Sequence, residues 1–434
     1  MDSSITAIII IVVMMVLYIT ELLPIAATSL LACLAFAVFG IISFGDVFSG
    51  FGNDMVFLVV GMMVVGDALF ETGVASYIGK RIVSLTGSNE RALIAALIVV
   101  VIPISMFLSN TATVATMLPI AASAIAMSGG KLTKKNTYMT IAMVSVAGGG
   151  LTLVGSTPQL IAQGILTEGG YGSIGFFEFA IIGGPILALM VVYVLTLGYK
   201  LMKKVFVFHE VTDPIPDVAQ TAQEEPADAD YKLHKYTSIA IIRMCISVAV
   251  LVFCVIGFIT GLWTTGIVAM VGAVICVVTG CISQNKVFQK MSWTSVVILG
   301  CSFGVAAGLE QSGAGRMIAH GMLALLGENL TPWLLCAVLA LVACVLTNFM
   351  SSTATAALLV PIAALVAVEL GYNVKTIVMA VAIAVNIGYA TPISTPPLTM
   401  TLSAGYRFMD YVKVGGLMNV MAYLLTIALL PLIL

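Results

Sequence analysis

Charged residues are scarce in this sequence. Only 9% of its 434 residues are Asp, Glu, Lys or Arg, whereas 61% are hydrophobic. A soluble domain has about a quarter of its residues charged, so a water-soluble globular fold is excluded. Mean hydropathy is +1.15, and apolar runs repeatedly reach about 20 residues, the length that crosses a bilayer. The sequence therefore predicts an all-α polytopic membrane protein that contacts the lipid bilayer.

Several signatures of other protein classes are missing. The net charge is −2, and no basic cluster accompanies aromatic residues, so a nucleic-acid partner is excluded. The eight cysteines form no CxxC pair, and the three histidines lack metal-ligand spacing. No catalytic dyad or nucleophile motif is present, so we expect no enzyme. The first apolar run is long and follows no Lys or Arg, which predicts a retained span rather than a signal peptide.

A duplication is visible within the sequence. Residues 109–121 read SNTATVATMLPIA and residues 351–363 read SSTATAALLVPIA, with eight of thirteen positions identical at an offset of 242. Each half of the chain contains three apolar spans, one long apolar run and two further spans. We therefore divide the chain into a first repeat (1–202), a linker (203–238) and a second repeat (239–434).

Charge placement predicts how these repeats are oriented. With five spans and one returning hairpin per half, sixteen of the eighteen basic residues fall on one side of the membrane, and only Arg316 and Lys375 fall on the other. The positive-inside rule makes that side cytoplasmic. Linker 203–238 is then cytoplasmic, and both termini are external in a multi-pass plasma (inner) membrane protein. An odd number of crossings per half predicts two inverted-topology repeats, an arrangement found in many secondary transporters.

The long runs 92–128 and 331–368 carry their polar residues near the middle. Two full crossings would place these residues at the far surface, whereas a re-entrant helical hairpin places them near the midplane. We predict hairpins. Ser, Asn and Thr are favourable helix N-caps, and the free N–H groups at a helix start attract anions. The free carbonyls of the preceding arm and the side-chain oxygens suit Na⁺, so one tip can hold an anion beside a coupling ion.

Glycine and proline interrupt two other spans. GGGLTLVGSTPQ lies within the span 138–165, and NIGYATPISTPP lies within the span 376–404. A helix broken at this depth exposes carbonyl and N–H groups that must line a cavity. We therefore predict broken helices at the midplane, each facing the hairpin tip of its own half. Asp67 is the acidic residue placed deepest in a predicted span, and its role is left open.

These motifs resemble the divalent anion:sodium symporter family, the INDY-like di- and tricarboxylate carriers. The similarity includes ITELLPIAATSLL at 19–31, the SNT tip, GLTLVGSTPQ at 150–159 and ISTPPLTMTLSAGYRFMDYVKVG at 393–415. The resemblance implies a homodimer in which a transport domain moves like an elevator against a scaffold. From the resemblance we expect the family's additional first span to be absent, which agrees with an external N-terminus.

The resemblance also implies two Na⁺ sites and a substrate site. The first Na⁺ site comprises Ser105, Ser109, Asn110 and the Gly155 carbonyl, and the second comprises Thr347, the Met350 carbonyl, Ser352 and the Ser394 carbonyl. The residues expected to bind substrate are Asn110, Thr111, Ser156, Thr157, Ser352, Thr353, Thr395 and Pro396.

The sequence also departs from the family pattern. Ser352 stands where the family usually has Asn, Ser156-Thr157 replaces Thr-Pro, and Gln159 and Leu398 replace two asparagines. We hypothesise that Asn348, four residues before Ser352 and on the same helical face, partly replaces the missing amide. The two ion sites are therefore expected to be unequal.

The combined prediction is a secondary active transporter that imports small di- or tricarboxylates such as succinate by Na⁺ symport and alternating access. The alternatives are a Na⁺-independent exchanger, a carrier of sulfate or another oxyanion and, from other classes, a passive anion channel or an intramembrane enzyme.

Overall fold

The protein is described from a computed structural model that covers residues 2–83, 89–127, 132–206, 238–261, 263–326 and 330–432. These ranges contain helices and no strands, which confirms the predicted all-α class. Most of the predicted linker lies outside the described residues. The helices in chain order are α1 (Ser3–Thr20), α2 (Ile25–Val38), η1 (Ser49–Gly52), α3 (Asp54–Glu71), α4 (Val74–Val83), α5 (Glu90–Phe107), α6 (Asn110–Met127), α7 (Lys134–Gly149), α8 (Thr157–Glu168), α9 (Ala180–Leu195), α10 (Leu197–Val205), α12 (Ser238–Thr260), α13 (Thr265–Val278), α14 (Gln284–Lys290), α15 (Trp293–Gln311), α16 (Ala314–Leu326), α17 (Pro332–Leu346), α18 (Ser352–Glu369), α19 (Val374–Ala384), α20 (Pro396–Met400), η2 (Thr401–Ala404), α21 (Phe408–Leu429) and η3 (Leu430–Leu432).

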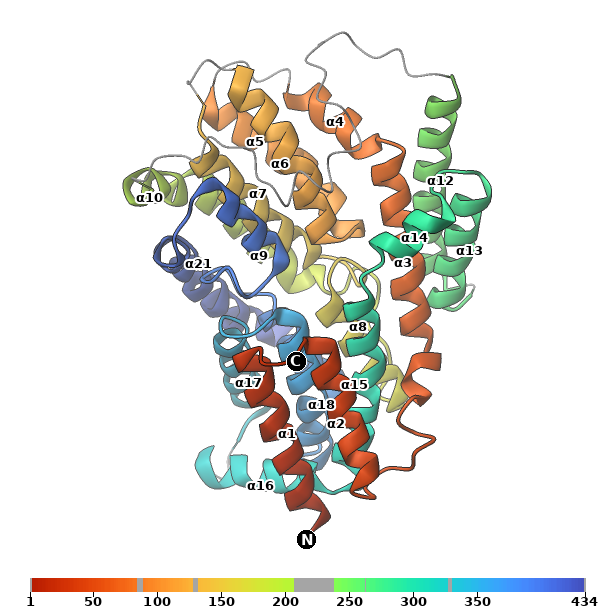
Figure 1. Cartoon of the computed structure of the whole chain (residues 1–434). Helices are drawn as coiled ribbons and strands as arrows, with labels where there is room; N and C mark the ends of the chain where they lie inside the picture. Colours follow the sequence, from red (N-terminus) through yellow and green to blue (C-terminus); the bar gives the residue numbers. More distant parts are fainter. Residues whose placement is uncertain are drawn as a thin grey trace.

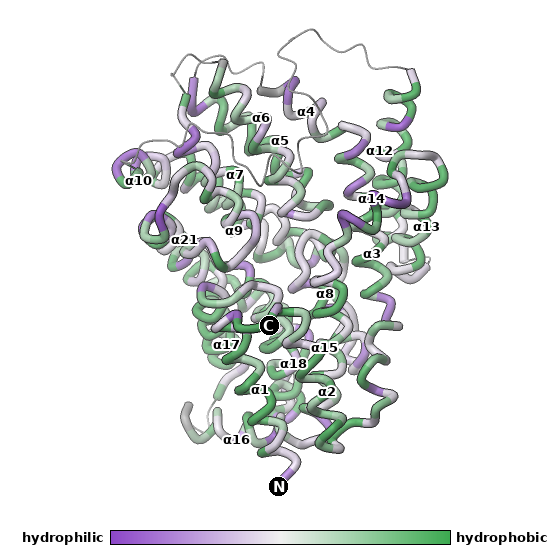
Figure 2. Tube along the Cα trace, in the orientation of Figure 1, coloured by the Kyte–Doolittle hydropathy of each residue, from purple (hydrophilic) through white to green (hydrophobic). Residues whose placement is uncertain are grey.

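Many of these helices are suited to a bilayer. In the described part of the chain, six helices are long and apolar enough to cross a membrane, and two pairs bent by 51° and 50°, α3–α4 and α9–α10, raise the number to eight. Five further apolar helices have 10–17 residues, shorter than the roughly 20 residues of a straight crossing. Figure 2 shows hydrophobic residues along α1, α2, α12 and α13, and hydrophilic stretches on α4, α10 and α14.

Large apolar side chains remain exposed on the outer helices. On α12, for example, Ile239, Ile242 and Ile256 are each more than half exposed. Exposed apolar area of this extent is typical of a membrane-facing surface. The interior is equally apolar and joins residues of both halves into one large core.

The order of elements is the same in the two halves. Helices α2 to α8 in the first half correspond to α13 and α15 to α20 in the second, and Gly73 and Gly313 both adopt left-handed backbone angles, with φ of 83° and 73°. The corresponding helices α4 and α16 lie at opposite ends of the molecule (Figure 1). This placement is the one that an inverted repeat requires.

Two helical hairpins and two interrupted helices form the centre. Helices α5 and α6 make one hairpin and α17 and α18 the other. The chain leaves helical geometry between α7 and α8, and again between α19 and α20. These interruptions coincide with the two glycine- and proline-containing motifs.

Candidate functional site

The hairpin tips are defined by local helix signals. In the first hairpin, Leu108 is extended with φ −121° and ψ 166°, which ends α5 and lets the chain reverse before α6 begins at Asn110. In the second, the Ser351 side chain accepts a hydrogen bond of 3.2 Å from the Ala354 N–H and so caps α18. Each tip therefore places the start of a long helix inside the protein.

Side-chain and main-chain oxygens crowd together behind the first tip. Ser105 Oγ lies 2.5 Å from Asn110 Oδ1 and 2.5 Å from the Ser145 carbonyl oxygen, and 3.0 Å from Ser145 Oγ. Ser145 Oγ in turn donates to the Asn110 carbonyl over 3.2 Å. One serine proton cannot serve both acceptors at 2.5 Å, so the cluster has more acceptor oxygens than donors.

The break after α7 comes against the same tip. A Cβ added to Gly149 would lie 2.3 Å from Asn110 Oδ1 and 2.7 Å from the Gly155 carbonyl oxygen. Only glycine fits at this position, because any side chain would displace one of these oxygens. Of the four residues predicted for the first ion site, the structure thus brings Ser105, Asn110 and Gly155 together, whereas the Ser109 side chain is exposed.

The second tip is built from the corresponding positions. Ser352 N–H donates to the Ser394 carbonyl over 2.9 Å, and Thr347 Oγ1 donates to the Val385 carbonyl over 2.8 Å. Met350 is buried at the tip between them. Ser394 Oγ donates to the Thr391 carbonyl over 2.9 Å and also contacts the Gly388 carbonyl.

One hydrogen bond is repeated at both tips. Thr152 Oγ1, in the first break, donates to the Met106 carbonyl, and Thr391 Oγ1, in the second, donates to the Asn348 carbonyl over 2.8 Å. The two threonines occupy matching places in the motifs, and so do the two acceptors in the hairpins. Each break is therefore attached to its own hairpin in the same way.

The hypothesis that Asn348 and Ser352 share a helical face is wrong. Helix α17 ends at Leu346 and α18 begins at Ser352, so the chain turns between the two residues. The Asn348 amide donates to the Cys344 carbonyl over 2.6 Å, and Asn348 Oδ1 accepts from Asn419 Nδ2 over 3.1 Å. Its side chain thus attaches the hairpin to α21.

The two halves also contact each other at the breaks. Ser156 Oγ donates to Asn386 Oδ1 over 2.8 Å. Helix α8 packs against α18 and α19 of the second half, and α20 packs against α6 and α7 of the first. Each broken helix therefore contacts its own hairpin at the break. Its second arm, which is α8 or α20, contacts the other half.

Buried polar atoms without partners lie at the starts of these second arms. Ser156 and Thr395 are the N-cap residues of α8 and α20, with matching φ of −148°. Neither hydroxyl caps its own helix; Thr395 Oγ1 is buried and has no hydrogen-bond partner in the described protein. Gln159 is fully buried, and both polar atoms of its amide likewise lack a partner. Such groups are rare in folded proteins and indicate contact with a ligand or water.

The remaining residues predicted to bind substrate occupy helix starts. Thr111 and Thr353 are the second residues of α6 and α18, and Thr157 and Pro396 are the first residues of α8 and α20. Thr111, Thr157 and Thr353 are partly buried, whereas Pro396 is exposed. Three of these helices, α6, α8 and α18, are at least 12 residues long, so their free N–H groups favour an anion without a basic side chain.

Sequence reasoning missed Ser145 and Asn386. Ser145 lies in an apolar helix with no repeated partner, since Ala384 stands at the corresponding place, and Asn386 corresponds to Ala147. The only signal available was a polar residue inside an otherwise apolar span. The described residues also contain no group of three His, Cys, Asp or Glu side chains that could hold a metal ion.

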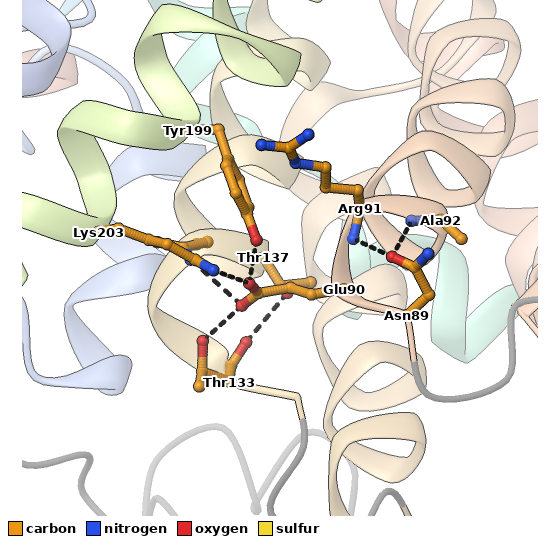
Figure 3. A network of polar contacts seen from close by, with 9 residues as sticks. Asn89, Glu90, Arg91, Ala92, Thr133, Thr137, Tyr199 and Lys203 are labelled. Carbon is orange, nitrogen blue, oxygen red and sulfur yellow. Dashed lines mark hydrogen bonds and ion pairs between the residues drawn. The ribbon is translucent and has the colours of Figure 1, made fainter.

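A separate polar network fixes the base of the first hairpin (Figure 3). Glu90, the first residue of α5, accepts hydrogen bonds of 2.7 Å from Thr133 Oγ1 and 2.5 Å from Tyr199 Oη, and forms an ion pair of 3.5 Å with Lys203. The Arg91 guanidinium lies 4.8 Å from the centre of the Tyr199 ring. These contacts join α5 to α7 and α10, far from the tip.

Asp67, whose role the sequence left open, lies one turn before Glu71 on α3. Glu71 pairs with Lys286 and Lys290 of α14. Asp67 therefore lies close to this ionic cluster along α3.

Comparison with known proteins agrees with this architecture. Residues 15–377 match the model of the citrate transporter family, CitMHS. The chain is 23% identical over 462 aligned residues to the sodium-dependent high-affinity dicarboxylate transporter 3 of Caenorhabditis elegans, covering 95% of this chain and 80% of that protein. It is 26% identical over 437 residues to the sodium-dependent dicarboxylate transporter SdcS of Staphylococcus aureus, covering 94% and 82%.

A solved structure shares the fold. The crystal structure of the YdaH transporter of Alcanivorax borkumensis superposes with a TM-score of 0.59 at 16% identity, covering 89% of this chain and 86% of that one. The resemblance to divalent anion:sodium symporters is thus confirmed by the named relatives, and the matches are to transporters rather than enzymes. Because the family model spans most of the sequence, the chain belongs to the citrate transporter family.

Proposed function

We propose that this protein is a secondary active transporter that imports small di- or tricarboxylates, succinate-like in size, together with Na⁺. The observation that carries the proposal is the crowding of acceptor oxygens around Ser105, beside the start of α6 at Asn110. Excess oxygen acceptors stabilise a hard cation, and a helix start stabilises an anion. The positive charge of Na⁺ and the negative charge of the substrate would therefore compensate each other at one tip.

The first ion site is assigned to Ser105, Asn110 and Gly155, with Ser145 added from the geometry. The second is assigned to Thr347, Met350, Ser352 and Ser394. Substrate carboxylates are assigned to the helix starts at Asn110-Thr111, Ser156-Thr157, Ser352-Thr353 and Thr395-Pro396. The unpartnered Thr395 hydroxyl supports this assignment because a carboxylate oxygen would satisfy it.

The membrane arrangement follows from charge. We propose that the end with α4 and the base of the first hairpin faces the cytoplasm of an inner-membrane protein, since nearly all basic residues fall on that side. The termini are then external. A homodimer with elevator-type motion is proposed by similarity to the family.

Uptake into proteoliposomes tests the function. Radiolabelled succinate and citrate should accumulate above equilibrium when an inward Na⁺ gradient is imposed, and choline in place of Na⁺ should abolish accumulation. Accumulation that does not depend on the Na⁺ gradient but requires dicarboxylate inside the liposomes would establish an exchanger instead. Uptake of sulfate alone would establish an oxyanion carrier, and flux that only equilibrates with the gradient would indicate a channel.

A variant at the first tip tests the site. Asn110→Ala removes an amide that contacts Ser105 and Gly149, so uptake should be lost although the protein remains folded. Ser403→Ala is the matched control, because among the described residues this hydroxyl bonds only to the Met400 carbonyl in its own turn. Normal uptake by Asn110→Ala would make the tip structural.

A further inference from the structure

A polar cavity lies away from the hairpin tips. It has a volume of about 280 Å³ and lies among the end of α3, the start of α12 and the turn between α13 and α14. A water molecule takes about 30 Å³ in the liquid, so a group as large as a phosphate diester fits. The start of α12 lies toward the end of the molecule where α4 is found (Figure 1).

Basic side chains outnumber acidic ones around this cavity. Glu71 is part of the lining, and its two carboxylate oxygens bind Lys286 Nζ over 2.7 Å and Lys290 Nζ. Arg243, which also lines the cavity, is exposed and forms no ion pair with any described residue. Asp67, one turn along α3, is the other acidic side chain nearby. Of the residues that line the cavity, Arg243 and Lys286 are basic and Glu71 is acidic, so the lining carries a net positive charge.

Exposed apolar side chains lie near the cavity residues in the sequence and are suited to a membrane interface. Ile239 and Ile242 of α12 are 60% and 56% exposed, and Val278 at the end of α13 is 79% exposed. After α14, Trp293 is half exposed and stacks on Phe288 with ring centres 6.4 Å apart at an angle of 12°. Tryptophan and basic residues at the end of apolar helices mark the level of the lipid headgroups.

We propose that this cavity binds the phosphate of an anionic phospholipid headgroup. The Arg243 guanidinium offers paired donors matched to phosphate oxygens, and Lys286 supplies a second positive charge. The acyl chains would lie on the exposed side chains of Ile239, Ile242 and Val278. Basic cavities between membrane helices at the cytoplasmic side recognise anionic headgroups in this manner.

Native mass spectrometry of the full chain in neutral detergent tests the proposal. The wild type should retain phosphatidylglycerol in preference to phosphatidylcholine, and Arg243→Gln should weaken phosphatidylglycerol retention at least about tenfold, as expected for a lost charge-assisted contact. Arg243→Lys keeps the charge without the paired donors, so its retention of phosphatidylglycerol should lie between those of the wild type and Arg243→Gln. Lys413→Gln on α21 removes an equal charge outside the cavity and should leave retention unchanged.

Inorganic phosphate distinguishes the source of the anion. Millimolar phosphate that protects the protein from thermal unfolding through Arg243, with no preference among lipids, would show a soluble-anion site and overturn the lipid proposal. Equal loss of lipid in Arg243→Gln and Lys413→Gln would overturn it as well. Unfolding temperatures without lipid, expected to be alike for all variants, show that each one is folded.

Discussion

Ser156 Oγ donates a 2.8 Å hydrogen bond to Asn386 Oδ1, and this bond joins the break of the first half to that of the second. Asn386 is nine-tenths buried and also donates to the Ala382 carbonyl over 3.0 Å. The two residues come from unrelated places in the two motifs, because Ser156 corresponds to Thr395 and Asn386 to Ala147. The contact therefore belongs to the assembled pair of halves and not to either half alone.

Ser156→Ala tests this contact. The variant leaves a buried amide oxygen without its donor, so the free energy of unfolding in mixed detergent and SDS should fall by about 1–3 kcal/mol. In a double-mutant cycle, Ser156→Ala and Asn386→Ala should be non-additive, whereas Ser403→Ala and Asn386→Ala should be additive. Additivity of the first pair would show that the bond contributes nothing.

Gly149→Ala tests the approach of the first break to the hairpin tip. The new Cβ would lie 2.3 Å from Asn110 Oδ1, so the amide must move away from Ser105. The Na⁺ concentration for half-maximal uptake should rise at least tenfold, a change of about 1.4 kcal/mol. Gly184→Ala on α9 is the control, since nothing lies within 4 Å of its added Cβ. Unchanged Na⁺ dependence in Gly149→Ala would remove the first ion site from this tip.

The sequence was sufficient to locate the hairpins and the breaks because these depend on local signals. Ser351 caps α18, and glycine and proline interrupt apolar runs whose length is fixed by the bilayer. The duplication of residues 109–121 then showed which polar residues belong together.

What the sequence could not give were contacts between distant helices. Ser145 joins the first tip because α7 packs on α5 and α6, and nothing in its own neighbourhood distinguishes it from other serines in apolar helices. The error on Asn348 has a similar origin, since extending α17 by one turn would have put it on the face of Ser352. The helix instead ends at Leu346, and the tertiary partner Asn419 determines the direction of the side chain.

Gln159→Met tests the buried amide of α8. Both amide atoms are buried without partners in the described protein, so an apolar side chain of similar volume should preserve or raise the unfolding temperature. If the amide instead contacts substrate in the loaded transporter, the KM for succinate or citrate should rise severalfold. Leu160→Met, an apolar exchange at the next position, is the control. Unchanged KM together with reduced stability would identify Gln159 as structural.

Asn348→Ala tests the corrected assignment of this side chain. Its loss leaves the Asn419 amide without an acceptor, so stability should fall by about 1 kcal/mol or more, while the Na⁺ concentration for half-maximal uptake stays the same. Asn419→Ala should give a similar loss, with a further cost because Asn419 Oδ1 also accepts from Tyr389 N–H over 2.8 Å. A changed Na⁺ dependence in Asn348→Ala would restore the role inferred from the sequence.

The two tips differ in which residue carries the larger side chain. The first tip has a large residue in the hairpin and a glycine in the break, whereas the second has serine at both places. The first half combines Asn110 with Gly155, and the second combines Ser352 with Ser394. A Cβ on Gly149 would meet the Asn110 amide, whereas a Cβ on the corresponding Gly388 would meet Ser394 Cβ at 2.8 Å and Oγ at 3.2 Å. The Ser394 hydroxyl thus lies close to the space that an amide uses in the first half.

This difference predicts compensation between Ser352 and Ser394. Ser352→Asn alone should reduce uptake because the longer side chain meets Ser394 in a buried tip, where overpacking costs about 1–3 kcal/mol. The double variant Ser352→Asn with Ser394→Gly reproduces the pair of the first half and should recover uptake, with a steeper dependence on Na⁺ concentration than the wild type. Ser394→Gly alone, which removes the hydroxyl without supplying an amide, should bind Na⁺ more weakly. If the double variant takes up no more substrate than Ser352→Asn alone, the side chains at positions 352 and 394 do not occupy the same space.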